Sequence, residues 1–222
     1  PYPDEGAPHR CTWCGGLFDD VEPMVWNAPD ARRPGIWRHL GSLFPELTQV
    51  SLGEGQTPLV DLIIGHRRVH LKCEYANPTG SFKDRGTAAL ITALVARGVQ
   101  AAVEDSSGNA GASFAAYAAR CGMQAAVFVP EGASGPKRRQ IEAYGARLQP
   151  ISGPRSNATA AAESAASSGS PYASHAYLPF NLHGYATTAY EIVEQLGSVV
   201  GAVIAPAGQG GLLLGMSRGF DA

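Results

Sequence analysis

The most diagnostic part of this 222-residue sequence is the run Asn77-Pro78-Thr79-Gly80-Ser81-Phe82-Lys83-Asp84-Arg85-Gly86. Pro78 and Gly80 indicate a turn, and the helix-compatible stretch 87–97 follows directly. Lys83 is therefore expected near the start of a helix, where the positive end of the helix dipole disfavours an ammonium charge. This position favours a neutral, nucleophilic amine. The alternative is an ordinary solvated lysine, with Asp84 as the acidic residue of the first helical turn.

Strand and helix patterns alternate on both sides of this run. Residues 59–64 and 68–74 predict a short hairpin around Gly65-His66. The other expected strands are 101–104, 125–129, 147–151 and 199–205, and the other expected helices are 110–121, 136–144, 158–166 and 184–196. Such an alternation predicts an α/β fold in which helices cover a parallel sheet.

A second loop of small residues lies between the expected strand 101–104 and the helix that follows it. It reads Ser106-Ser107-Gly108-Asn109-Ala110-Gly111. Backbone N–H groups at a helix start, together with the helix dipole, form an anion-binding site. The alternative is an ordinary strand-to-helix turn in which Ser107 or Asn109 caps the helix.

A third loop follows the expected strand 199–205 and reads Gly208-Gln209-Gly210-Gly211-Leu212. Glycines allow close backbone approach, so successive N–H groups can surround a phosphate ahead of a helix. The loop has neither the lysine of a P-loop nor the spacing of a dinucleotide-binding motif. We therefore expect a phosphate site of another kind.

Together these loops resemble those of the fold-type II (tryptophan synthase beta-like) enzymes that depend on pyridoxal 5'-phosphate (PLP), and the threonine synthase branch in particular. The segment 51–60, SLGEGQTPLV, also resembles this branch. The resemblance implies that Lys83 is the catalytic residue, which forms a Schiff base with the cofactor and then moves substrate protons. Asp84 is expected to orient the helix start.

The same resemblance assigns the remaining site residues. It implies that Asn109 hydrogen-bonds the phenolic oxygen of the cofactor, whose phosphate lies on Gly208, Gln209, Gly210, Gly211 and Leu212. It also implies that the substrate binds Ser81, Ser106, Ser107, Gly108, Asn109 and Ala110. Gln209 departs from the family, which commonly has glycine there.

The resemblance further implies a two-domain fold-type II architecture. Residues 1–50 are expected to form an irregular arm, 51–98 and 185–222 an incomplete larger PLP-binding domain, and 99–184 a smaller α/β domain. The chain stops eleven residues after Gly211, whereas family members continue well beyond this loop. The C-terminal part of the larger domain is therefore expected to be missing, either because the sequence is a fragment or because the protein is naturally shortened.

The segment 178–191 bears on the reaction. In threonine synthases that use phosphohomoserine, an arginine usually stands where this chain has Asn181. Because its absence removes a bidentate phosphate contact, we expect an unphosphorylated or differently activated amino acid. Three other basic residues that could replace it are expected to be solvated surface charges: Lys72, Arg138 and Arg155.

Three functions follow from the resemblance. The first is a threonine synthase-like lyase or synthase that acts by β- or γ-elimination or replacement. The second is an ammonia-lyase similar to serine/threonine dehydratase. The third is a truncated, non-catalytic homologue with a regulatory or assembly role.

The composition limits the kinds of binding partner that we expect. A net charge of −2 gives no electrostatic reason to expect nucleic acid or an anionic membrane. No apolar run approaches the roughly 20 residues of a membrane span, and no leader pattern is present, so we expect a cytoplasmic protein. The expected partner is a small-molecule amino acid, and the family resemblance adds a homodimer.

Four cysteines are present. Only Cys11 and Cys14, in Cys11-Thr12-Trp13-Cys14, have a spacing typical of metal ligands, with His9 nearby. Because no second pair follows, we expect no metal site, and by resemblance the two are the remnant of an N-terminal cysteine knuckle. The alternative is that Cys11 and Cys14 are metal ligands. Cys73 and Cys121 have apolar neighbours and are expected in the core.

Overall fold

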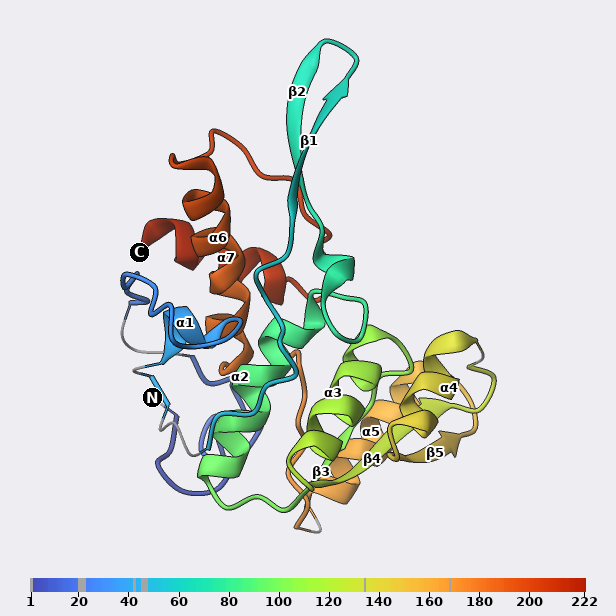
Figure 1. Cartoon of the computed structure of the whole chain (residues 1–222). Coiled ribbons are helices and arrows are strands. Elements are labelled where there is room, and N and C mark those ends of the chain that lie inside the picture. Colours follow the sequence, from blue (N-terminus) through green and yellow to red (C-terminus); the bar gives the residue numbers. More distant parts are fainter. Residues whose placement is uncertain (1, 20–22, 42, 45–47, 134, 168) are drawn as a thin grey trace.

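The computed structural model describes residues 2–19, 23–41, 43–44, 48–133, 135–167 and 169–222. Figure 1 shows three parts: an α/β layer, a group of helices that includes α2, α6 and α7, and a hairpin that projects away from both. The start of α2, which carries the Lys83 run, lies where these parts meet.

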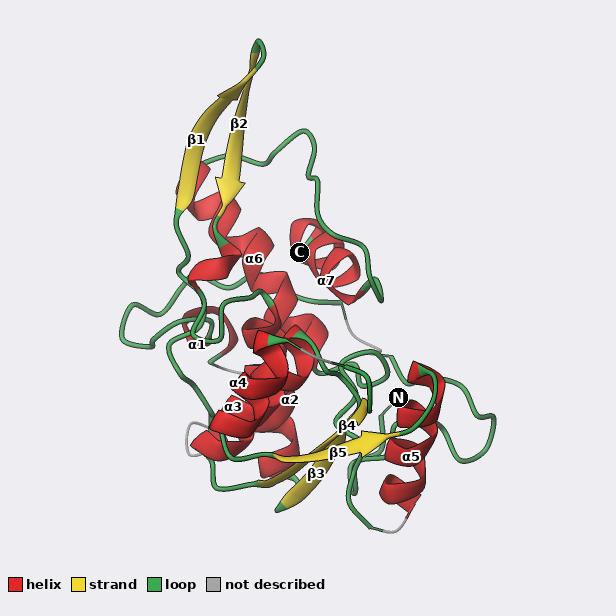
Figure 2. Cartoon of the chain, turned by 90° about the vertical axis from the view of Figure 1, so that its right-hand side faces the viewer, coloured by secondary structure: helices red, strands yellow, loops and turns green. Residues whose placement is uncertain are grey.

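A three-stranded parallel sheet with the order β3-β4-β5 forms the α/β layer. Figure 2 shows α3 and α4 on one face of this sheet and α5 on the other. The elements are β3 (Ala101–Glu104), α3 (Asn109–Arg120), β4 (Gln124–Pro130), α4 (Pro136–Ala143), β5 (Arg147–Ile151) and α5 (Arg155–Ser167). Val127 and Val129 of the central strand are fully buried, as expected for a strand covered on both faces. The predicted α/β fold is confirmed.

The helical group consists of α2 (Lys83–Ala96), α6 (Asn181–Leu196) and α7 (Gly211–Asp221), with the short α1 (Trp37–Leu40) beside α6. Residues on every side of α2 are buried, because it packs against α3 as well as α6. Helix α6 begins three residues before the predicted Gly184, and α5 begins three residues before the predicted residue 158. The helices themselves were predicted; their first turns were not.

Glycines allow the helices to cross closely. A Cβ on Gly184 of α6 would lie 2.0 Å from the Arg85 carbonyl oxygen of α2, and one on Gly86 would lie 2.5 Å from the Tyr185 ring. On α7, a Cβ on Gly215 would lie 2.8 Å from the Leu182 carbonyl oxygen. The Lys-Asp-Arg-Gly sequence therefore ends in glycine because Tyr185 occupies the place of a side chain.

The Gly184→Ala variant is expected to lose about 3 kcal/mol of unfolding free energy, because backbone atoms must move to admit the methyl group. Urea unfolding measures the loss. Gly201→Ala is the matched control, since a Cβ there meets no atom within 4 Å, and its effect is expected to stay within about 0.5 kcal/mol. Equal losses in the two variants would rule out the close crossing as the cause.

The projecting hairpin pairs β1 (Leu59–Ile64) with β2 (Arg67–Lys72) around the predicted turn Gly65-His66. The predicted second strand ended at residue 74, but the chain leaves the strand after Lys72, and Glu74 starts the 3-10 helix η2 (Glu74–Ala76). The hairpin is largely exposed, and Ile63 has 80% of its surface open to solvent.

The predicted strand 199–205 is wrong. This segment pairs with no described strand, and the Ile204 side chain is fully exposed. An apolar run gains stability as a strand only when a neighbour accepts its backbone hydrogen bonds, and no described residue supplies one here.

The largest group of packed buried side chains crosses the predicted domain boundary between residues 98 and 99. It includes Leu90 and Leu94 of α2, Phe114 of α3 and Val127 of β4. Trp37 of the N-terminal arm is also buried in it. The division into 1–50, 51–98 with 185–222, and 99–184 therefore stays a prediction.

Candidate active site

Lys83 is the first residue of α2, and no side chain caps this helix start. Its Nζ lies 5.1 Å from the ring centroid of Phe82 and 6.0 Å from that of Tyr185. Burial lowers the pKa of Lys83 to about 8, against the opposing attraction of Glu104. From the sequence, the helix dipole was expected to favour the neutral amine. The lowered pKa agrees with that expectation, but its main cause is burial.

Lys83 differs in its contacts from the other two lysines of the chain. Lys72 Nζ donates hydrogen bonds to Glu191, Gln195 and the Thr57 carbonyl oxygen, and Lys137 Nζ donates to the Thr79 carbonyl oxygen and Gln140. Lys83 Nζ makes no hydrogen bond or ion pair with any residue that the structure describes. It is the lysine whose amine is left for chemistry.

Asp84 fixes the turn that precedes Lys83. Its carboxylate accepts hydrogen bonds from the Thr79 N–H at 2.6 Å, from Thr79 Oγ1 at 2.5 Å and from Ser113 Oγ of α3 at 2.6 Å. Burial raises the pKa of Asp84, although these hydrogen bonds act against the shift. Because both oxygens are occupied, Asp84 orients the loop and ties α2 to α3. Ser81 lies beside it, and its Oγ accepts the Lys83 N–H at 3.4 Å.

Arg85 is fully buried in an ionic cluster that the sequence did not reveal. Its Nη1 and Nη2 each lie 2.7 Å from an oxygen of Glu191, and its Nε and Nη2 each lie 2.8 Å from an oxygen of Glu74. Lys72 Nζ adds a contact of 2.7 Å to Glu191. The prediction that Lys72 is a solvated surface charge is therefore wrong. We call Lys72, Glu74, Arg85 and Glu191 the buried ionic cluster; it joins α2, α6 and the end of β2.

The buried ionic cluster makes stability depend on pH. Burial alone would raise the pKa of Glu191, but hydrogen bonds from Arg85 and attraction to Arg85 and Lys72 outweigh it and lower the pKa to about 2. A carboxylate whose pKa falls on folding stabilises the protein above its unfolded pKa, and this contribution is lost as pH falls. We expect about 3 kcal/mol of unfolding free energy to disappear between pH 4.5 and 2.

Urea unfolding at a series of pH values measures this loss. The Glu191→Gln variant is expected to lose much less stability across the same window, since its side chain cannot titrate. Glu142→Gln, at an exposed position of α4, is the control and is expected to keep the pH dependence of the unchanged protein. A profile unchanged by Glu191→Gln would contradict the assignment.

The loop from Ser106 to Ala110 leads from β3 into α3. Helix α3 begins at Asn109, its N-cap is Gly108, and no side chain caps it. The alternative that Ser107 or Asn109 caps the helix is therefore wrong, and the first-turn N–H groups are left without side-chain partners. Ser106 is buried and its Oγ accepts the Gly108 N–H at 3.2 Å, whereas Asn109 is exposed.

The loop from Gly208 to Leu212 leads into α7. Helix α7 begins at Gly211, and its N-cap, Gly210, has a φ of 83° and makes no side-chain cap. Glycine suits Gly210, since other residues rarely adopt this conformation. Gln209 has no positive φ, so a side chain is tolerated where the family commonly has glycine. Leu212 is buried, and it secures the helix start in the apolar cluster around Tyr185.

Tyr185 connects two of the three loops. A Cβ on Gly211 would lie 3.3 Å from one edge of the Tyr185 ring, and Lys83 Nζ lies near the same ring. The bond between Ser113 and Asp84 brings α3, and with it the loop from Ser106, against the start of α2. These contacts place the start of α7 beside Tyr185 and α3 beside the start of α2. Tyr185 was missed, although Gly86 was a signal that α2 contacts a large group.

Asn181, predicted to replace a phosphate-binding arginine, is buried and used structurally. Its Nδ2 donates a hydrogen bond of 2.6 Å to the His175 carbonyl oxygen. Arg138 donates to the Ala133 carbonyl oxygen, and Arg155, half exposed, pairs with Asp105 at 3.3 Å. None of these contacts points to a phosphate-binding role.

The cysteines occupy different environments. Cys11 begins a turn closed by its N–H to the Gly16 carbonyl oxygen, and backbone hydrogen bonds from Cys14 and Trp13 lower its pKa. Within the described ranges no group of three or more metal-ligating residues occurs. Cys73 is buried, and Cys121 is half-buried against the core, as predicted.

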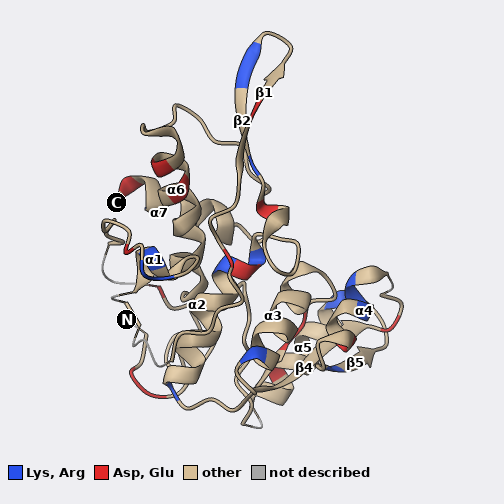
Figure 3. Cartoon of the chain, viewed as in Figure 1, with Lys and Arg blue, Asp and Glu red and all other residues tan. Residues whose placement is uncertain are grey.

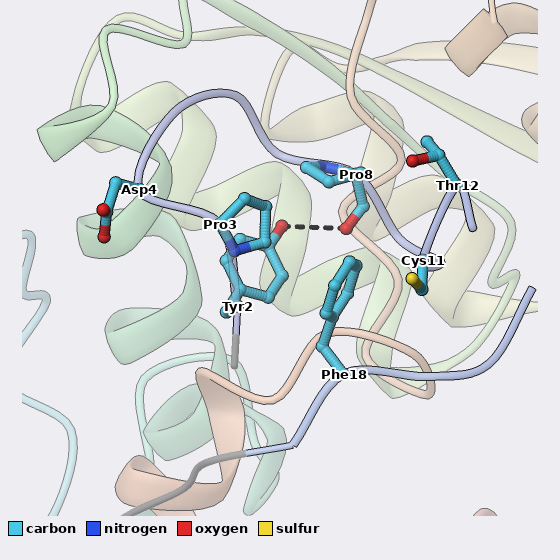
Figure 4. Close-up of a pocket in the computed structure, with 7 residues that line it drawn as sticks. All are labelled: Tyr2, Pro3, Asp4, Pro8, Cys11, Thr12 and Phe18. Atoms are coloured by element: carbon cyan, nitrogen blue, oxygen red, sulfur yellow. Dashed lines mark hydrogen bonds between the residues drawn. The ribbon is translucent and has the colours of Figure 1, made fainter. Parts of the chain in front are cut away.

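A cavity of about 400 Å³ lies within the N-terminal arm (Figure 4). It is lined by Tyr2, Pro3, Asp4, Pro8, Cys11, Thr12 and Phe18, and it contains no residue of the three loops. The Tyr2 hydroxyl crosses it to the Pro8 carbonyl oxygen at 2.9 Å. This cavity belongs to the arm and is separate from the candidate active site.

The distribution of charge and the hydropathy of the helices give little further information about the candidate active site. Figure 3 shows basic and acidic residues interspersed over the chain, with opposite charges side by side at the start of α2. None of the described helices is long and apolar enough to cross a membrane.

The fold and the site define a class of protein: an α/β protein with a half-buried lysine amine of lowered pKa, close to two uncapped helix starts. Such a site suits a cofactor that carries both a carbonyl group and a phosphate. Comparison with known proteins names that cofactor. The sequence model described as "Pyridoxal-phosphate dependent enzyme" matches residues 50–222. The chain belongs to this family of pyridoxal-phosphate-dependent enzymes.

The chain is also similar to individual proteins. It is 36% identical to the threonine synthase of Methanocaldococcus jannaschii over 93% of this chain and 55% of that protein. Among solved structures, O-ureido-L-serine synthase is 28% identical with a TM-score of 0.68, covering 74% of this chain and 55% of that one. Maize serine racemase, at 23% identity and a TM-score of 0.69 over 74% of this chain and 52% of that one, shares the fold. The chain spans about half the length of the relatives it matches.

Proposed function

We propose that the protein to which this chain belongs is a PLP-dependent lyase or synthase that acts by β- or γ-elimination or replacement on an amino acid, similar to threonine synthase. The observation that carries the proposal is the Lys83 amine, which is half-buried, has no described ion-pair partner and has a pKa lowered to about 8. Similarity to threonine synthases over most of the chain supports this reaction class.

The residues fit the cofactor. When bound, PLP supplies an electron sink that stabilises negative charge at the substrate α-carbon. We assign its covalent attachment to Lys83 and its phosphate to the loop from Gly208 to Leu212, where the uncapped start of α7 offers N–H groups. The exposed Asn109 side chain is assigned to the phenolic oxygen.

The substrate carboxylate is assigned to the uncapped start of α3. Its partners would be Ser81 and the loop residues Ser106, Ser107, Gly108, Asn109 and Ala110. Lys83 Nζ is the group that takes and returns substrate protons, since an amine of pKa about 8 is present in both protonation states near neutral pH.

A second reaction, release of ammonia as in a serine/threonine dehydratase, is favoured by one observation. The Asn181 amide is held by the His175 carbonyl oxygen, so it is not available to grip a substrate phosphate. An unphosphorylated hydroxy amino acid is therefore the second candidate substrate.

The test has two stages on the longest available form of the protein. PLP is added, borohydride is used to reduce any covalent attachment, and peptide mass spectrometry locates it; attachment at Lys83 is expected. A screen of phosphorylated and unphosphorylated amino acids then measures released phosphate and ammonia. Ammonia without phosphate would select the dehydratase-like reaction, and absence of any PLP attachment would refute both.

We also propose a cytoplasmic, homodimeric protein, and the two-domain division at residues 98 and 184. These assignments rest on the family resemblance of the three loops. Light scattering of the purified protein measures the mass of the assembly, and a monomer at all concentrations would refute the dimer.

A further inference from the structure

The N-terminal arm carries two cysteines that the proposed function does not use. Cys11 and Cys14 are three positions apart, and both are free thiols. The Gly15 N–H donates a hydrogen bond of 2.9 Å to the Cys11 carbonyl oxygen, so residues 11–15 form one closed turn. The Cys11 N–H donates to the Gly16 carbonyl oxygen, also at 2.9 Å. These two bonds close the backbone around the pair.

The turn places the two cysteines within the range of a disulfide. The first and fourth residues of a closed turn have Cα atoms less than about 7 Å apart, and a disulfide needs a Cα separation of about 4.4 to 6.8 Å. The Cys14 sulfur lies over the same backbone, since a Cβ on Gly16 would lie 3.3 Å from it. Gly16 is also the residue that accepts the Cys11 N–H. Rotation of the two side chains is therefore enough to join them.

Arg10 holds this turn against the rest of the molecule. Its Nη1 donates to the Gly15 carbonyl oxygen at 3.2 Å, and its guanidinium carbon lies 4.6 Å from the ring centroid of Tyr177. A fixed turn keeps Cys11 and Cys14 near each other in the reduced protein. Such proximity favours a bond within the pair over a bond to a distant cysteine.

Cys11 is the member of the pair that is prepared for attack on a small molecule. It lines the cavity of about 400 Å³ in the N-terminal arm, a volume typical of small-molecule sites (Figure 4). The N–H groups of Cys14 and Trp13 lower the pKa of Cys11, and the thiolate is the nucleophile in thiol–disulfide exchange. Cys73 is buried and burial raises the pKa of Cys121, so neither core cysteine shares these properties.

We propose that Cys11 and Cys14 form a reversible thiol–disulfide pair whose oxidant is a low-molecular-weight disulfide such as glutathione disulfide. The Cys11 thiolate attacks one sulfur of the oxidant, which forms a mixed disulfide and releases one small thiolate that takes up a proton. Cys14 loses its proton to solvent and attacks the Cys11 sulfur, and the second small thiolate leaves and is protonated. Two protein thiols and one small disulfide become one protein disulfide and two small thiols, so two electrons pass to the oxidant.

Equilibration with mixtures of glutathione and glutathione disulfide tests the pair. Acid quenching, alkylation of the remaining thiols and peptide mass spectrometry then measure its state. Both cysteines fall on the tryptic peptide 11–32, which contains no other cysteine. This peptide is expected to carry two alkyl groups when glutathione is in excess and none when glutathione disulfide is in excess. A strong reductant is expected to restore both thiols.

Single substitutions distinguish the roles of the two cysteines. Cys14→Ser is expected to accumulate a mixed disulfide of glutathione on Cys11, because the second step is blocked. Cys11→Ser is expected to react with glutathione disulfide roughly tenfold more slowly at pH 7, since it lacks the thiolate that the turn N–H groups stabilise. Cys121→Ser is the matched control, and its peptide 11–32 is expected to behave as in the unchanged protein.

Three results would overturn the proposal. The first is a peptide 11–32 that keeps two alkyl groups at every glutathione ratio, and the second is a disulfide that joins Cys11 or Cys14 to another cysteine. The third is one equivalent of zinc in the purified protein that is lost in both Cys11→Ser and Cys14→Ser, which would make the two cysteines metal ligands. The inference goes beyond the proposed function, and borohydride trapping of PLP at Lys83 tests that function separately.

Discussion

Replacing Lys83 with methionine is expected to abolish covalent attachment of PLP and to lower turnover roughly a thousandfold, since no other amine is placed to move the substrate proton. The physical reason lies in the pKa of about 8. At pH 7 roughly one Lys83 side chain in ten is unprotonated and nucleophilic, against fewer than about one in a thousand for an ordinary lysine. Methionine retains much of the apolar contact with Phe82 and Tyr185, so the fold is expected to persist.

The measurement is borohydride reduction in the presence of PLP, followed by peptide mass spectrometry. Lys137→Met is the matched control, because Lys137 donates to the Thr79 carbonyl oxygen close to the Lys83 run, and it is expected to retain the adduct. Circular dichroism checks that both variants fold. An adduct that persists in Lys83→Met, or one found on Lys72 or Lys137, would show that Lys83 is not the attachment residue.

Much of the fold was predictable because local signals agreed with packing. Pro136 in the first turn of α4 marked the helix start, and the alternation of strands and helices gave a parallel sheet covered on both faces. The strand expected over 199–205 failed because an apolar run does not specify its partner. Whether it pairs depends on residues distant in the sequence, and no described strand pairs with it.

The parts of the candidate site that backbone N–H groups form could be predicted from the sequence. The starts of α2, α3 and α7 fall on loops whose glycines and small residues were visible in the sequence. The long-range partners were not. Glu104 meets His175 across 71 positions and Arg85 meets Glu191 across 106, and no local pattern joins such pairs. In the sequence, Glu191 was noted only as part of a segment that resembles the family. Lys72 was assigned to the surface because no local pattern links it to Glu191.

Replacing Arg85 with methionine is expected to cost about 4 kcal/mol of unfolding free energy, more than the loss expected for Gly184→Ala. Arg85 has no exposed surface and bridges the carboxylates of Glu74 and Glu191. Methionine fills much of the space but leaves the buried carboxylate of Glu191 and the half-buried one of Glu74 without Arg85, and Lys72 is the remaining cation in contact with Glu191. Removing one partner from a buried ion pair costs more than the pair itself contributes, because the other charge stays desolvated.

Thermal unfolding measures this loss, and the melting temperature is expected to fall by about 10 °C for a domain of this size. Arg139→Met, at an exposed position of α4, is the control and is expected to change the free energy by less than about 0.5 kcal/mol. The triple variant in which Arg85, Glu74 and Glu191 become Met, Gln and Gln is expected to be more stable than Arg85→Met alone, since no carboxylate of the cluster remains. If the triple variant is less stable than the single one, the cost lies in lost packing between α2 and α6, and the charge argument fails.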